Sequence, residues 1–192
     1  MADVLDALIA EKRHGAAIVL RDVRLTALAG EFVGLSGPSG CGKTTLMNIL
    51  AGIDRAFAGS LVAPQARGVV FQDPRLLPWR SVAANIALAA PGMTAAAIDA
   101  VLASVGLPGT GDLLPGQLSL GMARRVALVR ALAVQPRLLL LDEPLVSLDE
   151  DSARICRRVV MEYWETYRPI VVMVSHDAAD LAAMAHRVMR LG

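Results

Sequence analysis

The spacing of hydrophobic and polar positions changes along the chain, and each spacing predicts a different element. Residues 18–25 alternate apolar with polar side chains, which predicts a strand with one buried face. The leucine run at 138–141 is typical of a parallel strand that is covered on both faces. Short apolar runs of this kind predict buried strands at 31–36, 68–72, 138–141, 170–174 and 187–191.

Helical patterns lie between these strands. We expect helices at 44–51, with Gly52 after its end, at 150–167 and at 177–185. From about 73 to 135 the pattern is helical throughout, with breaks at proline and glycine pairs. Strands that alternate with helices on both sides of a helical block predict one α/β domain. Its core covers about 1–72 and 136–192, and an inserted helical subdomain covers about 73–135.

One stretch raises the question of a membrane span. Residues 82–106 contain a single charge, Asp99, and the whole chain has a mean hydropathy of +0.50. Pro91, Gly92 and Gly106 interrupt the stretch, which is therefore too short to cross a bilayer. We predict two buried helices here, in a peripheral protein. The N-terminus lacks a basic segment followed by an apolar one, so no signal peptide is expected.

Charge and cysteine content narrow the choice of partners and compartment. The chain has 19 basic and 18 acidic residues, a net charge of +1, so nothing indicates binding to nucleic acid. Cys41 and Cys156 lack the spacing of a metal site. A reducing cytoplasm is the expected location.

A glycine-rich stretch joins the predicted strand at 31–36 to the predicted helix at 44–51. It matches the phosphate-loop pattern G-x-x-x-x-G-K-[ST] in that context, which favours ATP binding over a chance turn. Its glycines let backbone N–H groups converge on phosphate oxygens, while the helix adds its positive end. We expect Lys43 to reach the β- and γ-phosphates and Thr44 to hold Mg²⁺. The loop reads Gly37-Pro38-Ser39-Gly40-Cys41-Gly42-Lys43-Thr44-Thr45.

Two acids, Asp142 and Glu143, follow the leucine strand. Carboxylates at the end of a buried strand are costly unless they have a function. We expect Asp142 to hold Mg²⁺ through water and Glu143 to act as general base toward the attacking water. The alternative is that both simply end the strand in solvent before Pro144, which fits poorly with a phosphate loop upstream.

Further motifs resemble those of the ABC ATPase family, in the family's order and over nearly the whole chain. Alone, each has an ordinary alternative, such as a helix N-cap for a serine, but their common order makes coincidence negligible. They are Gln72 in Val70-Phe71-Gln72-Asp73-Pro74 (Q-loop), Leu118-Ser119-Leu120-Gly121-Met122 (signature), Asp149 in Ser147-Leu148-Asp149 (D-loop) and His176 in Val174-Ser175-His176-Asp177 (H-loop).

The resemblance implies a fold and a set of roles. The fold is that of a P-loop NTPase, with a RecA-like core, a parallel-rich sheet, a small antiparallel β part and the inserted helices. Glu143, His176 and Gln72 are then catalytic. ATP binds with Mg²⁺ at Thr44, Gln72 and Asp142. A second subunit supplies Ser119 and Gly121 over the γ-phosphate, and Asp149 belongs to the D-loop.

The resemblance also implies partners and a location. The family works as a homodimer, or with a paired ABC subunit, bound to integral-membrane permeases at the cytoplasmic face of the inner membrane. The segment from Phe71 to Trp79 resembles importers of nitrate, sulfonates or thiamine-like solutes, which also use a periplasmic solute-binding protein. Leu76 and Trp79 are expected either to line the permease groove or to lie in the subdomain core. An exporter subunit and a soluble DNA- or ribosome-associated ATPase are the alternatives, although the long coiled coil or second cassette of the latter is absent.

Two residues depart from the family pattern, and the chain is short. Leu120 replaces a signature glycine, and a leucine held at positive φ costs about 1–2 kcal/mol, so we expect hydrolysis that is retained but slowed. His14 stands where an aromatic residue normally stacks on adenine, and its alternative is a plain surface histidine. Because the sequence ends at its last predicted strand, we expect a minimal subunit without a regulatory C-terminal domain.

Overall fold

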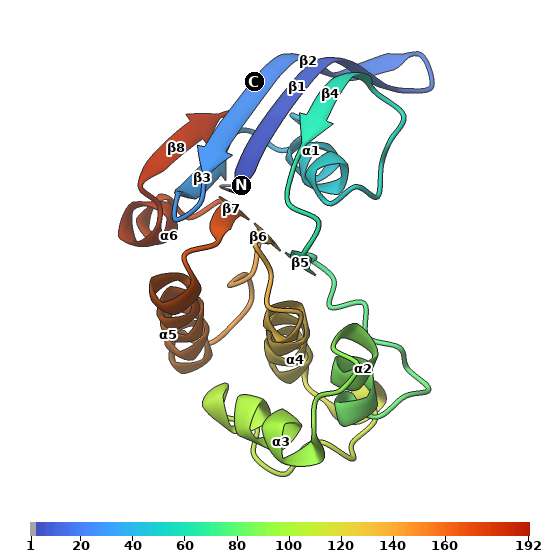
Figure 1. The fold of residues 1–192 in the computed structure, drawn as a ribbon, viewed down its shortest axis with the longest axis vertical. Helices are drawn as coiled ribbons and strands as arrows, with labels where there is room; N and C mark the ends of the chain where they lie inside the picture. The colour runs from blue at the N-terminus through green and yellow to red at the C-terminus, as the bar shows by residue number, and fades with distance from the viewer. Residues whose placement is uncertain (1–2) are drawn as a thin grey trace.

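The computed structural model describes residues 3–192, which form two sheets with helices packed around them (Figure 1). The larger sheet has five parallel strands in the order β5-β6-β7-β3-β8. Every residue of β6 and β7 is buried, which explains why these two strands are apolar along nearly their whole length. The strands are β3 (Phe32–Ser36), β5 (Arg67–Val70), β6 (Leu138–Asp142), β7 (Ile170–Val174) and β8 (Arg187–Arg190).

The second sheet is antiparallel, with the order β2-β1-β4. It consists of β1 (Val4–His14), β2 (Ala17–Leu28) and β4 (Ala58–Val62). The alternation at 18–25 predicted the middle of β2, whereas β1 and β4 were not predicted. In β1 the signal was present, because Leu5, Ala7 and Ile9 are buried in alternation. In β4 four of the five residues are exposed, so no hydrophobic pattern marks this strand.

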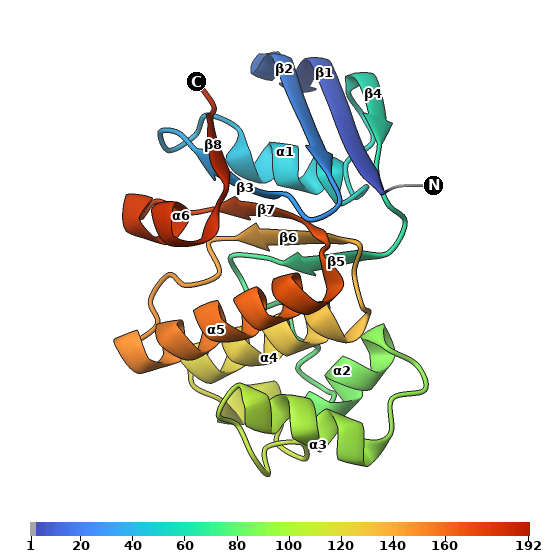
Figure 2. The same ribbon diagram turned by 60° about the vertical axis from the view of Figure 1, so that its left-hand side comes forward.

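The described residues contain six α-helices. Figure 2 shows α1 between the two sheets, α4 and α5 along the opposite face of the parallel sheet, and α2 and α3 farther out. A short 3₁₀ turn at Pro115–Gln117 precedes α4. The helices are α1 (Lys43–Leu50), α2 (Val82–Ala89), α3 (Ala95–Ser104), α4 (Leu120–Ala133), α5 (Glu150–Tyr167) and α6 (Ala178–Met184).

Three apolar clusters hold these layers together. One face of the parallel sheet packs with α1 and the antiparallel sheet through residues such as Leu46. The other face packs with α4, α5 and α6 in a cluster that includes Leu139 and Val160. A third cluster, which includes Ile86 and Leu102, joins α2, α3 and α4. The predicted α/β architecture with a parallel sheet and a helical block is confirmed.

The stretch 82–106 differs from its prediction. It forms α2 and α3, but only Ile98 and Leu102 of α3 are buried. The prediction of two buried helices is therefore wrong for α3. Four of its five alanines are exposed, and alanine gives little contrast between a core face and a water face. Within residues 3–192 no helix is both long and apolar enough to cross a membrane.

Candidate active site

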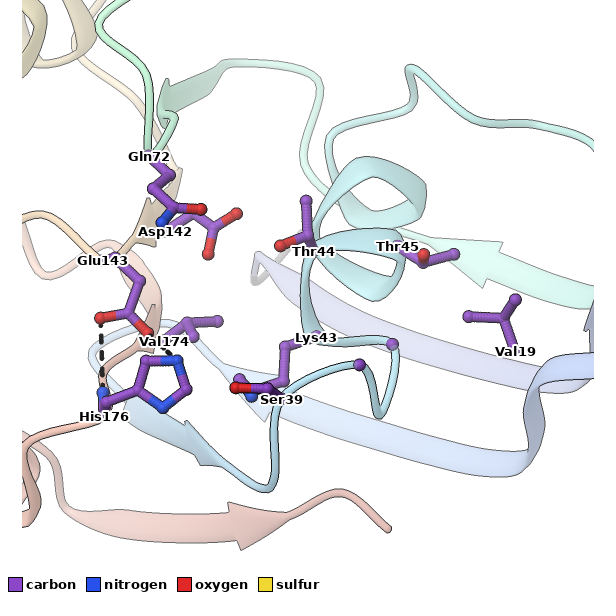
Figure 3. A pocket seen from close by; sticks show the side chains of 12 residues that line it. Val19, Ser39, Lys43, Thr44, Thr45, Gln72, Asp142, Glu143, Val174 and His176 are labelled. Atoms are coloured by element: carbon purple, nitrogen blue, oxygen red, sulfur yellow. Dashed lines mark hydrogen bonds and ion pairs between the residues drawn. The ribbon is translucent and has the colours of Figure 1, made fainter. Parts of the chain in front are cut away.

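A cavity of about 340 Å³ lies where β3, β5, β6 and β7 end (Figure 3). Open parallel sheets bind ligands at the carboxyl ends of their strands, since the connecting loops converge there. Its lining comes from five separate parts of the sequence. The lining residues are Val19, Ser39, Gly40, Gly42, Lys43, Thr44, Thr45, Gln72, Asp142, Glu143, Val174 and His176.

The glycine-rich loop between β3 and α1 forms one wall. Gly37, Gly40 and Gly42 have φ values of 148°, 81° and 95°, a region that other residues rarely adopt. A Cβ at Gly37 would collide with the carbonyl oxygen of Leu191, and one at Gly42 would lie 2.5 Å from a methyl group of Leu20. Glycine is therefore required at both positions by backbone conformation and by space.

The start of α1 faces this loop. Gly42 is its N-cap and supplies no side-chain acceptor, so the first N–H groups of the helix stay available to a ligand. Lys43 is 7% exposed, and its Nζ donates to the carbonyl oxygens of Gly37 and Pro38 at 2.8 and 2.9 Å. N–H groups, the positive helix end and an ammonium group together form a site for phosphate oxygens.

Asp142 and Glu143 form the opposite wall, at the end of β6. Asp142 is 3% exposed, and burial raises the pKa of its carboxyl group against the opposing effects of Thr44 and Lys43. Burial also raises the pKa of Glu143, with His176 as the main opposing influence. Glu143 adopts a left-handed conformation, φ 53°, while its N–H donates to the Val174 carbonyl at 3.1 Å. Strain and buried charge at one position are typical of a functional site.

His176 lies against Glu143, although 33 residues separate them. The backbone N–H of His176 donates to Glu143 Oε2 at 3.4 Å, and its ring Nε2 lies 3.2 Å from Glu143 Oε1. Figure 3 shows this pair on the side of the cavity that faces Lys43. The contact orients the Glu143 carboxylate and leaves the imidazole side chain 58% exposed.

Two further oxygen-bearing side chains lie beside Asp142. Figure 3 shows the Gln72 amide next to the Asp142 carboxylate, with the Thr44 hydroxyl facing both. Carboxylate, amide and hydroxyl oxygens are the hard donors that Mg²⁺ prefers. Among residues 3–192 no group of three or more His, Cys, Asp or Glu side chains could hold a metal by itself. These donors fit a cation that takes its remaining oxygens from a bound phosphate and water.

The signature residues lie elsewhere. Neither Ser119 nor Gly121 lines the cavity; Ser119 caps α4 by accepting from the Met122 N–H at 3.2 Å. Leu120 is the first residue of α4 and does not have a positive φ. The prediction of left-handed strain at Leu120 is therefore wrong, because a helix start accepts leucine without penalty. Its side chain is exposed beside Ser119 instead.

Two other predicted residues also lie outside the cavity. Asp149 caps α5, accepting from the Ser152 N–H at 2.9 Å and the Ser152 hydroxyl at 2.7 Å. The Ser152 N–H, as the larger influence, lowers the pKa of Asp149. The exposed His14 lies at the end of β1, its Nε2 3.5 Å from Thr45 Oγ1. The predicted loop residues Gly37, Pro38 and Cys41 are also not part of the lining.

Sequence reasoning missed two apolar lining residues. Val19 comes from β2 and Val174 from the end of β7. Val19 belongs to an alternating strand pattern that carries no sign of a ligand. Val174 was placed correctly at a strand end, but only the order of the strands brings it beside Glu143.

Replacing Asp142 with asparagine is expected to raise the Tm of the ligand-free chain by about 2–4 °C, about 1 kcal/mol. Folding raises the pKa of this carboxyl group. Its contribution to stability is therefore complete only below its pKa in the unfolded chain, and it is lost as the pH rises through its pKa in the folded chain. Asparagine cannot ionise, so the variant does not suffer this loss at neutral pH. The gain should therefore vanish below the ordinary aspartate value of 3.8. Thermal unfolding at several pH values measures it.

Asp149→Asn is the matched control for this stability prediction. Folding lowers the pKa of Asp149, so neutralising this carboxylate should produce no gain in Tm. A Tm of Asp142→Asn below that of the wild type at neutral pH would show that Thr44 and Lys43 outweigh the cost of burial.

The sequence of this chain is similar to a known protein family and to curated proteins. A family profile described as ABC transporter matches residues 20–146. The aliphatic sulfonates import ATP-binding protein SsuB 3 of Nocardia farcinica is 44% identical over 174 residues, which cover 90% of this chain and 70% of that protein. SsuB 1 of Pseudomonas aeruginosa, with the same description, is 40% identical over 207 residues, which cover 100% of this chain and 83% of that protein.

A solved structure of an ATP-binding cassette has a similar fold. A dimeric ATP-binding cassette in a post-hydrolysis state, bound to ADP and Pi, matches with a TM-score of 0.85 and 26% identity. The match covers 97% of this chain and 94% of that one. The predicted P-loop NTPase fold is thereby confirmed.

Proposed function

This chain belongs to the ABC transporter family, and on that premise we propose that it is the ATPase subunit of an importer for aliphatic sulfonates. ATP hydrolysis coupled to transport is the activity of the family. The choice of solute rests on the similarity of this chain to relatives described as aliphatic sulfonate import proteins. They are 40–44% identical to it over at least 90% of its length.

We assign the chemistry to the residues that meet in the cavity. Lys43 and the N–H groups at the start of α1 bind the phosphates of ATP. Glu143 accepts the proton of the attacking water, and its raised pKa keeps it more basic than an ordinary glutamate. His176 holds the Glu143 carboxylate in place and presents its ring to the γ-phosphate. Most of the rate enhancement then comes from positioning ATP and the attacking water and from electrostatic stabilisation of the transition state.

Mg²⁺ fits the oxygen donors beside Asp142. Thr44, Gln72 and Asp142 would hold it, and when bound it neutralises charge on the phosphates. The low exposure of Asp142 supports this role, because a bound cation offsets the free-energy cost of burying a carboxylate.

A second subunit completes the site. Ser119 and Gly121 lie outside this chain's own cavity, at the start of α4, where the positive end of a helix favours phosphate. We propose that they cover the nucleotide of a second copy or a paired ABC subunit, and that Asp149 lies at the same interface. The solved relative that binds ADP and Pi is a dimer, which supports this arrangement.

The permease is proposed to dock on the helical subdomain, residues 73–135, while residues 1–72 and 136–192 form the core. Trp79 is 72% exposed, so its alternative placement in the core is wrong. Leu76 packs partly against the helical cluster of α2–α4 and therefore contributes to that core. Docking at Trp79 would hold the chain at the cytoplasmic face of the inner membrane.

The proposal is tested by reconstitution with the permease encoded nearest to this chain and its periplasmic solute-binding protein. In proteoliposomes, an aliphatic sulfonate is expected to stimulate ATP hydrolysis at least about fivefold and to be taken up. A complex containing Lys43→Ala is the inactive control. Stimulation by nitrate but not by sulfonates would contradict the proposed solute. Release of the solute in place of uptake would contradict the proposed direction of transport.

A further inference from the structure

Arg130 of α4 holds the loop that carries Gln72. Its Nη1 donates to the carbonyl oxygen of Arg75 and its Nη2 to that of Pro74, both at 2.8 Å. A planar guanidinium can bridge two neighbouring carbonyls, whereas a lysine ammonium is a single point donor. The clamp therefore depends on arginine at 130 and on the backbone, not the side chains, of the loop.

This clamp places a partly buried cation on neutral acceptors. Burial lowers the pKa of Arg130, and its bonds run to carbonyl oxygens. Removing a charge from water without an opposite charge is costly for stability. The acceptors of this cation lie two and three residues after Gln72, so the clamp acts on the position of that loop.

The clamped loop has a defined shape. Arg75 has a φ of 47°, in the left-handed region, and its guanidinium lies 3.9 Å from the centre of the Phe71 ring. Gln72 lies between these two residues and lines the nucleotide cavity. The loop is thus held on both sides of Gln72, at Phe71 before it and at Pro74 and Arg75 after it.

Helix α4 connects the clamp to the signature. Ser119 caps the helix, and Arg130 follows Leu120 on the same uninterrupted helix. A rise of 1.5 Å per residue separates these two helical positions by about 15 Å. Ser119, Pro74 and Arg75 also line one surface hollow, so the signature and the clamped loop are neighbours. A displacement of α4 at Ser119 would reach the Gln72 loop through a rigid element.

We propose that Arg130 is a positioning residue that couples the two nucleotide sites of the dimer. The inference rests on the proposed function, in which Ser119 covers the second subunit's nucleotide and Gln72 serves its own. Engagement of Ser119 moves α4, and Arg130 draws the Gln72 loop with it. Each site becomes competent for hydrolysis only when the other is closed, which is positive cooperativity.

Arg130→Lys and Arg130→Gln test the proposal, the second variant serving if the first folds poorly. With the purified full chain, the rate of ATP hydrolysis is measured against ATP concentration, together with binding of a fluorescent ATP analogue and Tm. The Hill coefficient is expected to fall from about two to about one. We expect kcat to fall about tenfold, while affinity for the analogue stays within about twofold.

Arg67→Lys is the matched control. Arg67 also donates to two carbonyl oxygens, of Pro64 and Leu50, and burial lowers its pKa too, but it lies outside the cavity. This variant is expected to lose Tm and to keep the Hill coefficient of the wild type.

The outcomes separate the two proposals. If Arg130→Lys keeps the wild-type Hill coefficient, or changes only in Tm as Arg67→Lys does, Arg130 is structural and the coupling is wrong. If the wild type hydrolyses ATP without cooperativity, the coupling is wrong, whereas the two-subunit site fails only if ATP does not produce a dimer of Glu143→Gln. Loss of cooperativity in a folded Arg130 variant, with the wild-type Hill coefficient kept in Arg67→Lys, supports the proposal.

Discussion

Glu143→Gln is expected to lower kcat for ATP hydrolysis about a thousandfold, while ATP binding stays within about twofold. Glutamine has almost the same volume and keeps an oxygen to accept the His176 N–H, which lies 3.4 Å from Glu143 Oε2. Its amide, however, cannot take a proton from water. Phosphate release at saturating ATP and Mg²⁺ measures kcat, and titration with a fluorescent analogue measures binding.

The matched control for this variant is Glu150→Gln. Glu150 is an exposed carboxylate that pairs with Arg157 at 3.1 Å, outside the cavity. Its kcat should stay within about twofold of the wild type, as for most surface substitutions. Equal turnover by the wild type and Glu143→Gln would remove Glu143 from the role of general base.

The same variant reports on the second subunit. Because ATP persists in Glu143→Gln, added ATP is expected to convert monomer into dimer in size-exclusion chromatography. Adding Ser119→Arg places a long cation where the second subunit's nucleotide would be covered, and it should abolish the ATP-dependent dimer. A dimer that survives this change would contradict the position proposed for Ser119.

Lys43→Ala is expected to weaken ATP binding about a hundredfold, or about 2.7 kcal/mol. The ammonium is the charged donor of the loop, and it also ties the loop together through the Gly37 and Pro38 carbonyls at 2.8 and 2.9 Å. Its loss removes a charge from the phosphate site and loosens the loop. Equilibrium titration with a fluorescent ATP analogue measures the affinity.

Lys12→Ala is a close control for Lys43→Ala. Lys12 is also buried, pairs with Asp54 at 2.7 Å and donates to the Ala56 carbonyl at 2.8 Å. It lies outside the cavity, so its removal should lower Tm and leave ATP affinity unchanged in the folded chain. If both variants bind ATP equally well, Lys43 does not contact phosphate.

Elements with a strong local pattern were predicted well from the sequence. The helix at 150–167 and the strand at 170–174 have the bounds observed for α5 and β7. The helix begins at an aspartate cap, and the strand is apolar throughout, so each signal is complete within a few residues. β4 was missed because it is held by pairing with β1, a contact between residues far apart in the sequence.

The same distinction applies to the candidate site. The sequence predicted the phosphate loop and the acids at 142 and 143, because strand, loop and helix signals follow one another there. It misjudged Leu120, since the motif position suggested positive φ while the structure starts a helix at that residue. The resemblance assigned Ser119 and Gly121 to a second subunit's nucleotide, and in the structure neither residue lines this chain's own cavity, while Ser119 lies on a separate surface.

The sequence by itself determined which chemical groups this protein carries and the short elements that bear them. Only the tertiary structure decided that Glu143 meets His176, that Gln72 lies beside Asp142 and that Arg130 clamps the loop after Gln72. The physical reason is one of range. Helix periodicity, caps and glycine turns act over a few residues, whereas these contacts depend on the order of strands in the sheet and on where α4 packs against it.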